Sequence, residues 1–118
     1  MDDSRPIFRQ LAEQIENQII DGSLTEGAQV PSINEYAAFH RINPATALKG
    51  ITLLVDAGVL YKPRGIGMFV PDGARAALIA ERRTTFRDDF LRPLLAEARA
   101  LGISAEELAD MIRKDTTP

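Results

Sequence analysis

The first apolar pattern of the chain runs from Ile7 to Asp21 and predicts an amphipathic helix. Its apolar residues recur about every four positions, so they line one face of the helix and are expected to pack into a core. They are Ile7, Leu11, Ile15, Ile19 and Ile20. Gly22 follows as the residue that ends the helix. After a turn, residues 28–30 predict a brief strand, which Pro31 ends.

The stretch Pro31–Leu60 predicts two short helices joined by a tight turn. Ser32 with Glu35 has the pattern of a capping box, in which each side chain bonds a backbone N–H of the first turn. Asn43 and Pro44 begin the second helix, because Asn is a strong N-cap and Pro is tolerated at the first helical position. So short a link leaves the start of the second helix projecting outward. This is the helix-turn-helix geometry that lets a helix enter a DNA major groove.

Each of these helices has an inward and an outward face. The first is expected to pack inward through Ile33, Tyr36, Ala37 and His40, with Phe39 beside them. The second is expected to bury Ala47, Ile51, Leu54, Val55 and Gly58 and to present Ala45, Thr46, Lys49, Thr52, Leu53 and Asp56. His40 is the only histidine, and a lone histidine at the end of a helix indicates a structural role rather than a metal ligand.

Residues 59–62 and 68–70 predict two strands with a glycine-rich hairpin tip between them, which is a wing. Gly65 and Gly67 allow positive φ angles and a close backbone approach to a partner. Arg64 stands beside them as a candidate contact to a phosphate or a minor groove. No helix follows the glycine pair, so the context of a nucleotide-binding loop is missing.

Residues 71–73 predict a domain boundary, and strong helix formers follow from Ala74 to about Leu101. Pro93 interrupts them, so we expect a kink or a break into two helices there. Gly102 ends this segment, and Ser104 with Glu107 predicts a second capping box. The last helix presents Leu108, Met111 and Ile112 and is expected to end near Lys114, with 115–118 frayed.

The apolar residues of this second segment form a seam of coiled-coil type. The expected dimerisation residues are Ile79, Phe86, Phe90, Leu94, Ala98, Leu101 and Leu108. The segment has little core of its own, and the commonest solution is a two-fold symmetric homodimer. The alternative is that the seam packs back on the first helix of the same chain.

The whole pattern predicts a mainly α fold with a small β wing. A winged helix-turn-helix domain over residues 1–72 is followed by a helical dimerisation segment over 73–118. The net charge is −3, and residues 1–72 carry six basic and nine acidic groups. This balance disfavours a broad basic surface for nucleic acid. A local cluster of Arg41, Lys49, Lys62 and Arg64 can still face a duplex while the acids face away.

Several classes of function are disfavoured by what the chain lacks. Without cysteine it has no disulfide, thiolate nucleophile or thiolate zinc site. With one histidine and no convergent polar set, the remaining candidates for catalysis are adjacent carboxylates such as Asp88 and Asp89, which do not face each other on a helix. We therefore expect that the chain is not an enzyme and has no catalytic residue, metal or cofactor. No signal peptide or membrane-spanning run is seen, which predicts a cytoplasmic protein that does not bind membranes.

The sequence resembles the GntR family of bacterial winged-helix transcription regulators from about residue 5 to 71. Pro6, Ile7 and Phe8 and the run QLAEQIENQIIDGSLTEGAQVPSINEYA resemble the family's opening helix, its G-x-L-x-x-G turn and its P-S-x-x-x-x-A helix start. INPATA resembles the start of its recognition helix, and Arg64–Val70 resembles its wing, R-G-x-G-x-F-V. Residues 97–108, EARALGISAEEL, resemble the short tail of the YtrA-like branch.

This resemblance implies a homodimeric repressor that binds an inverted-repeat operator in double-stranded DNA, often near transporter genes. The DNA-binding residues expected from it are Ser32, Asn34, Asn43, Ala45, Thr46, Lys49, Arg64, Gly65 and Gly67. The chain departs from the family at Asn34 and Leu48, where arginine or another basic residue is usual. We expect these departures to change the preferred operator, since Asn can bond adenine as Arg bonds guanine.

Two further interpretations stay open. The acidic first domain, with Leu48 and the outward Leu53, favours an alternative in which a winged-helix module has weak or lost DNA affinity and binds a protein. A groove at the dimer interface, lined by Phe86, Phe90 and Arg83 or Arg87, is a candidate site for an effector that is a small anion or metabolite.

Overall fold

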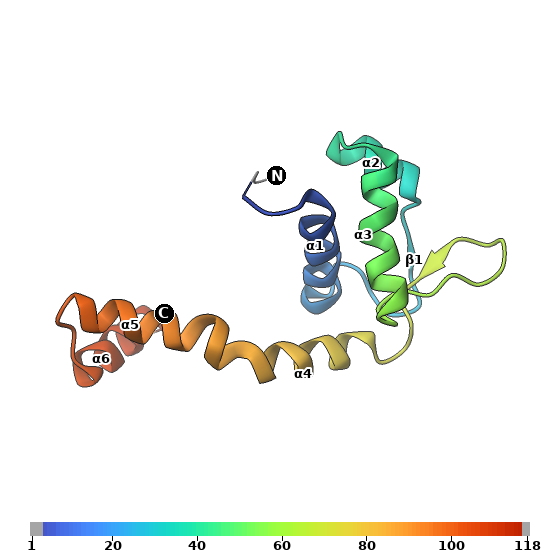
Figure 1. Cartoon of the computed structure of the whole chain (residues 1–118). Coiled ribbons are helices and arrows are strands. Elements are labelled where there is room, and N and C mark those ends of the chain that lie inside the picture. Colours follow the sequence, from blue (N-terminus) through green and yellow to red (C-terminus); the bar gives the residue numbers. More distant parts are fainter. Residues whose placement is uncertain (1–3, 117–118) are drawn as a thin grey trace. The chain divides into compact units, whose positions relative to one another are not determined.

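The computed structural model describes residues 4–116 of the chain (Figure 1). The elements in chain order are α1 (Ile7–Asp21), β1 (Gln29–Val30), α2 (Ile33–His40), α3 (Pro44–Asp56), β2 (Met68–Phe69), α4 (Ala74–Phe86), the π-helix η1 (Arg87–Leu91), α5 (Arg92–Ala100) and α6 (Ala105–Thr116). They form two compact units, of which the first ends at Ala80 and the second begins at Glu81.

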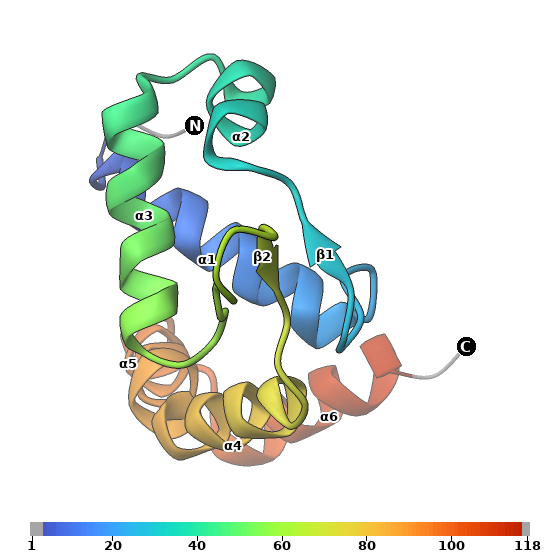
Figure 2. The ribbon, with the colours of Figure 1, turned by 90° about the vertical axis from the view of Figure 1, so that its right-hand side faces the viewer.

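The core of the first unit forms where α1 and α2 pack against α3 (Figure 2). The predicted first helix is confirmed: Leu11, Ile15 and Ile19 are almost fully buried, and Gly22 ends α1 with φ of 86°. Gly50 sits where α3 crosses α1, and a Cβ there would lie 2.6 Å from the carbonyl oxygen of Phe8. The two helix backbones therefore approach as closely as only glycine allows.

The sheet of this unit is smaller than the sequence predicts. β1 pairs antiparallel with β2, with Gln29 opposite Phe69 and Val30 opposite Met68. The expected strand 59–62 is reduced to one bridge, in which Tyr61 and Phe69 exchange backbone hydrogen bonds of 2.9 Å. The reason is that the N–H groups of residues 59 and 60 both donate to the carbonyl of Leu54 and so continue the end of α3.

Two residues assigned to buried faces are exposed. The side chain of Phe39 is 82% exposed, because on α2 it lies about 200° around the axis from the buried Ala37. Gly58 is exposed because α3 ends at Asp56, and Gly58 takes a φ of 76° in the turn that follows. The rest of the predicted stripe of α3 is buried or half-buried.

The two compact units meet later in the chain than the expected boundary between 1–72 and 73–118. Ala74 and Leu78, in the first turns of α4, belong to the core of the first unit, and Leu78 is only 2% exposed. The division therefore falls inside α4, between Ala80 and Glu81.

The second unit shows the interruption that Pro93 predicts. Five residues of π-helix, Arg87–Leu91, separate α4 from α5, and Pro93 lies just after them, in the first turn of α5. The backbone remains right-handed helical across the junction, so the helix changes type there without breaking. Gly102 ends the segment with φ of 71°, as expected. At the start of α6, the N–H of Glu107 donates to the Ser104 hydroxyl at 3.1 Å, which is the serine half of the predicted capping box.

Helix α6 is longer than expected, since it continues through Asp115 to Thr116. The Thr116 hydroxyl donates to the Ile112 carbonyl at 2.8 Å, and Lys114 pairs with Asp110 at 3.3 Å. The predicted fraying is therefore wrong for residues 115 and 116, and residues 117–118 lie outside the described range. Within residues 4–116, no helix combines the length and apolarity that crossing a membrane would require.

Candidate nucleic-acid interface

The start of α2 is shaped by the predicted capping box. The N–H of Glu35 donates to the Ser32 hydroxyl, and the N–H of Ser32 donates to a Glu35 carboxylate oxygen, both at 3.1 Å. Asn34 lies between them with an exposed side chain. The first N–H groups of a helix lack helical acceptors and carry the positive end of its dipole, so this end of α2 suits a phosphate.

The turn between α2 and α3 is held by backbone bonds. Arg41 adopts a left-handed conformation with φ of 56°, and the N–H of Ile42 donates to the Ala37 carbonyl at 3.0 Å. The Asn43 side-chain oxygen accepts the N–H of Ala45 at 2.8 Å, which confirms Asn43 as the N-cap. Its side chain is therefore occupied within the protein, and its candidate DNA contact is through the backbone.

The outward face of α3 carries few polar groups. Ala45, Leu48, Lys49 and Thr52 are exposed, whereas Thr46 is half-buried. The ammonium nitrogen of Lys49 lies 4.2 Å from the centroid of the Phe8 ring, a cation–π contact that holds the side chain against the start of α1. Leu48 is half-exposed and offers an apolar surface of the kind that contacts a thymine methyl group.

The wing presents Arg64 and Gly65 in an exposed loop between Tyr61 and Met68. Gly65 and Gly67 have φ angles of 72° and 93°, so both need the freedom expected of them. A Cβ on Gly67 would lie 2.6 Å from the side-chain nitrogen of Gln29, which shows how closely the wing backbone passes this side chain.

A cavity of about 270 Å³ opens between the start of α2 and the wing. It is lined by Gln29, Val30, Ser32, Ile33, Asn34, Glu35, Lys62, Gly67 and Met68. Three of the predicted residues, Ser32, Asn34 and Gly67, are thus brought together. The structure adds Gln29 and Lys62 to the candidate site. The sequence could have indicated that the Gln29 side chain faces outward, because it precedes the apolar Val30 in a predicted strand and neighbouring strand residues point to opposite faces.

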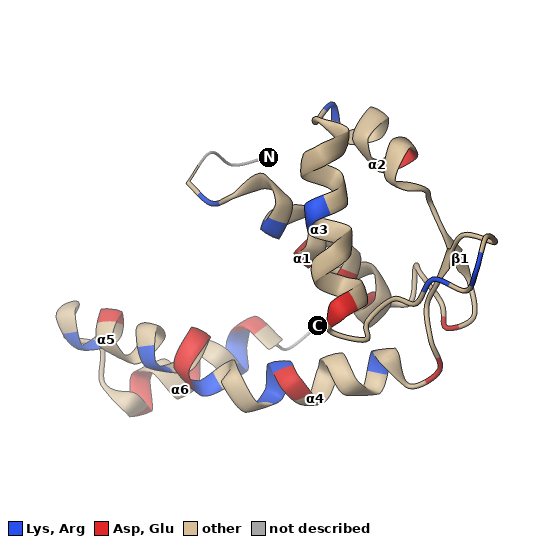
Figure 3. Cartoon of the chain, turned by 45° about the vertical axis from the view of Figure 1, so that its right-hand side comes forward, with Lys and Arg blue, Asp and Glu red and all other residues tan. Residues whose placement is uncertain are grey.

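Four of the six Lys and Arg residues between residues 4 and 72 lie on the elements of this face (Figure 3). Arg41 lies in the turn before α3, Lys49 lies within α3, and Lys62 and Arg64 lie in the wing loop. Acidic residues on the same elements are limited to Glu35, which caps α2, and Asp56 at the end of α3. The net negative charge of residues 1–72 therefore arises mainly elsewhere. Among residues 4–116, no cluster of His, Asp and Glu is arranged to hold a metal ion.

The predicted dimerisation residues fall into two groups. Phe86, Phe90, Leu94 and Leu101 are exposed, and the rings of Phe86 and Phe90 lie 5.6 Å apart. Ala98 and Leu108 are buried within the second unit, and Ile79 is half-buried.

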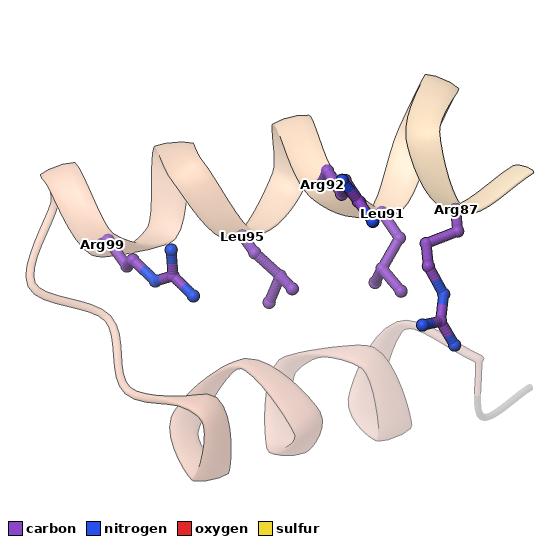
Figure 4. Close-up of a pocket in the computed structure, with 5 residues that line it drawn as sticks. All are labelled: Arg87, Leu91, Arg92, Leu95 and Arg99. Carbon is purple, nitrogen blue, oxygen red and sulfur yellow. The ribbon is translucent and has the colours of Figure 1, made fainter.

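A second cavity, of about 400 Å³, runs along η1 and α5. It is lined by Arg87, Leu91, Arg92, Leu95 and Arg99 (Figure 4). Of the residues expected in an effector groove, Arg87 lines it, while Phe86, Phe90 and Arg83 do not. Leu91, Leu95 and Arg87 extend toward the side on which α6 lies. Arg92 pairs with Asp88 at 3.1 Å.

Comparisons with known proteins agree on one family. The model of the family described as "Bacterial regulatory proteins, gntR family" matches residues 8–70. The HTH-type transcriptional repressor YtrA of Bacillus subtilis (strain 168) is 27% identical over 111 residues, which cover 94% of this chain and 85% of that protein.

Two solved structures extend the likeness. A GntR family transcriptional regulator from Listeria monocytogenes superposes with a TM-score of 0.80 at 25% identity, covering 97% of this chain and 98% of that one. The DNA-binding domain of AraR in complex with operator ORR3 superposes with a TM-score of 0.54 at 30% identity, covering 59% of this chain and 84% of that one.

Proposed function

This chain belongs to the gntR family of bacterial regulatory proteins, and we propose that it is a homodimeric repressor that binds an inverted-repeat DNA operator in the cytoplasm. Its membership makes it a DNA-binding transcription regulator rather than an enzyme. The finer parts of the proposal draw on the repressor YtrA, which resembles this chain over nearly its whole length, and on the unpartnered apolar seam of the second unit.

The observation that carries the proposal is the cluster of basic and hydrogen-bonding groups on α2, α3 and the wing. Ser32 and Asn34 offer the start of α2 to the DNA backbone, and Lys49 and Thr46 offer the first turns of α3 to the major groove. Arg64 and the wing glycines then reach the neighbouring minor groove. In a symmetric dimer, the two α3 helices would read half-sites about 34–36 Å apart or a multiple of that distance.

Replacing Lys49 and Arg64 together by Ala tests this arrangement. We expect operator affinity to fall at least about tenfold at physiological salt. Both cations would also neutralise nearby phosphates in the grooves, so their loss should lower the slope of log affinity against log salt by up to about 2. Fluorescence anisotropy on an operator selected from a random duplex pool measures both quantities.

The matched control replaces Arg113 and Lys114 by Ala, which removes the same charge from α6. Its affinity should stay close to that of the parent chain. Unchanged affinity of the Lys49 and Arg64 variant would mean that another face binds DNA. Absence of any binding to random duplex at about 50 mM salt would instead favour the alternative, a winged-helix module that binds a protein.

The proposed effector is a small anion with an apolar part, bound along η1 and α5. Arg87 and Arg99 supply charge to that cavity and Leu91 and Leu95 supply apolar surface. A panel of carboxylates and phosphates should contain compounds that raise the melting temperature of the parent chain but not of the Arg99→Ala variant.

Regulation of transporter genes is proposed on the family resemblance, and transcript levels of neighbouring genes in a deletion strain test it.

A further inference from the structure

We infer that a cleft between α1 and α2 binds a small organic cation that carries an alkylated ammonium group. The cleft has a volume of about 370 Å³ and lies within the first unit. Its walls include Gln14, Gln18, Glu35, Tyr36, Phe39 and His40. This site shares no residue with those proposed to contact DNA, although Glu35 also lines the cavity beside the wing. The inference does not depend on DNA binding.

Three aromatic rings give the cleft its shape. The rings of Tyr36 and His40 are nearly parallel, at 16° with centroids 6.3 Å apart. The Phe39 ring meets His40 edge-on, at 83° and 5.0 Å. The rings therefore form two walls at about a right angle. Aromatic faces carry negative charge density, and such arrangements attract alkylated ammonium groups in other proteins.

The charge of the lining selects a cation. Glu35 contributes a carboxylate, and the two glutamines contribute amide oxygens, whereas no lysine or arginine of the described chain lines the cleft. Within residues 4–116, Glu35 makes no ion pair with a basic side chain, and its carboxylate accepts only the N–H of Ser32. A bound cation would therefore meet π faces and acceptors, whereas an anion would be repelled.

Two unfavourable features of the free protein lie at this cleft, namely an exposed aromatic ring and a buried hydroxyl. Phe39 exposes most of an aromatic ring to water, although that ring is already in contact with its neighbour. The Tyr36 hydroxyl is buried and has no hydrogen-bond partner among residues 4–116. Burial raises the pKa of Tyr36 to about 12, so the hydroxyl remains neutral. A ligand in the cleft would cover the exposed Phe39 ring.

The test is a titration of the full chain with choline, followed in amide proton–nitrogen NMR spectra. We expect saturable shifts confined to residues of α1 and α2 that line the cleft. The comparison compound is the uncharged carbon isostere of choline, in which a tert-butyl group replaces the trimethylammonium group. Choline should bind about tenfold more tightly than this isostere, because only choline gains from the carboxylate and the ring faces.

Two variants locate the site. Phe39→Ala removes an exposed side chain and should weaken choline binding at least about fivefold without unfolding the protein. Glu35→Gln should weaken it several-fold while keeping the cap of α2, because glutamine also serves in a capping box. Ile66→Ala, which removes an exposed apolar side chain from the wing loop, is the control and should leave choline binding unchanged.

Other outcomes would overturn the inference. Equal affinity for the uncharged isostere would mean an unspecific apolar cleft. Shifts elsewhere, no saturable shift, or full affinity in Phe39→Ala would mean that choline does not occupy this site. A change in oligomeric state caused by Phe39→Ala alone would mean that a second copy of the chain covers Phe39.

Discussion

At the scale of single residues, Arg41 is the clearest sign of selection for something other than stability. Within residues 4–116 it is the one non-glycine residue with a positive φ, and it ends α2 where glycine is usual. A left-handed conformation costs a residue with a Cβ about 1 kcal/mol. We propose that the guanidinium of Arg41 contacts DNA, which would account for an arginine in this strained conformation before α3.

Replacing Arg41 by Gly should separate these two effects. The free energy of unfolding should rise by up to about 1 kcal/mol, because strain is relieved. Affinity for the operator should fall several-fold, because a charge is lost. Urea unfolding and anisotropy measure the two changes. Arg41→Ala is the control: it should lose the same affinity without gaining stability, and equal affinity in all three proteins would exclude the contact.

Tyr36 gives a prediction about alkaline pH. Its pKa is about 12 in the folded chain against an ordinary value of 10.0, because burial disfavours the charged form and Glu35 adds a negative charge. The folded state thus holds the Tyr36 proton more tightly than the unfolded state does. The resulting contribution to the free energy of unfolding is complete below about pH 10 and is lost as the pH rises toward 12. Between about pH 9 and pH 11 the free energy of unfolding should fall by about 1.4 kcal/mol from this source.

Comparison of the parent chain with Tyr36→Phe isolates this effect, since other groups titrate in both proteins. Urea unfolding at pH 9 and pH 11 should show that the free energy of unfolding falls by about 1.4 kcal/mol less in the variant than in the parent chain. At neutral pH the variant should be as stable as the parent or more stable, because the buried hydroxyl has no partner to lose among residues 4–116. An equal decline in both proteins would refute the pKa difference.

At the scale of elements, the first unit depends on the close crossing of α1 and α3. Gly50→Ala would place a methyl group 2.6 Å from the Phe8 carbonyl oxygen, and backbone cannot yield as a side chain can. We expect a loss of about 2–3 kcal/mol in the free energy of unfolding, despite the better helix propensity of alanine. Thermal or urea unfolding measures it. Thr52→Ala on the exposed face of α3 should be nearly neutral, and a neutral Gly50→Ala would mean that the helices can separate freely.

Which elements form could be predicted from local chemistry, because caps and glycines act over a few residues. Ser32, Asn43 and Gly22 therefore marked helix ends correctly. The prediction of a strand over residues 59–62 was wrong, because the N–H groups of residues 59 and 60 donate to the Leu54 carbonyl at the end of α3. A local sequence pattern does not show that a helix end competes for these donors. Gly50 was not singled out either, since the reason for a glycine inside a helix lies on another helix.

The π-helix η1 bears on how Phe86, Phe90 and Leu94 line up along the helix, and the rings of the first two lie 5.6 Å apart. Phe86, Phe90 and Leu94 are four residues apart, and in an α-helix such a series drifts about 40° around the axis at each step. The wider turn of a π-helix rotates the chain less per residue, which offsets this drift over Arg87–Leu91. The sequence predicted the interruption from Pro93 but could not predict its form.

At the scale of the whole molecule, the second unit cannot bury its own apolar surface. Phe90 is 65% exposed and Leu101 is 66% exposed, whereas α5 and α6 each bury a single residue. Exposed apolar clusters of this kind mark interfaces in soluble proteins. This is the physical argument for the proposed homodimer.

Phe90→Asp should give a monomer, because it places a charge in the proposed interface. Sedimentation equilibrium should show the halved mass, and operator affinity should fall at least about a hundredfold because the two half-sites no longer bind together. Thr85→Asp adds the same charge at an exposed position outside the seam and should remain dimeric. A dimeric Phe90→Asp variant with full affinity would place the interface elsewhere.

Among the candidate site residues, sequence placed the start of α2, the start of α3 and the wing on the first unit, because each follows from a cap or a turn. It could not show that Lys49 rests on Phe8 or that Lys62 and Gln29 share a cavity with Asn34, since these contacts join segments far apart in the chain. It also placed Phe39 inside, because the apolar character of a residue does not say whether a short helix has room to bury it.

The position of Leu78 also bears on how such proteins diversify. The first turns of α4 complete the core of the first unit. A recombination event at residue 72 would therefore separate the winged helix-turn-helix from part of its hydrophobic core. Crossovers after Ala80 would leave that interior whole and exchange only the second unit. Chimaeras of this chain with other regulators should therefore express and fold when joined after residue 80 and fail when joined at 72.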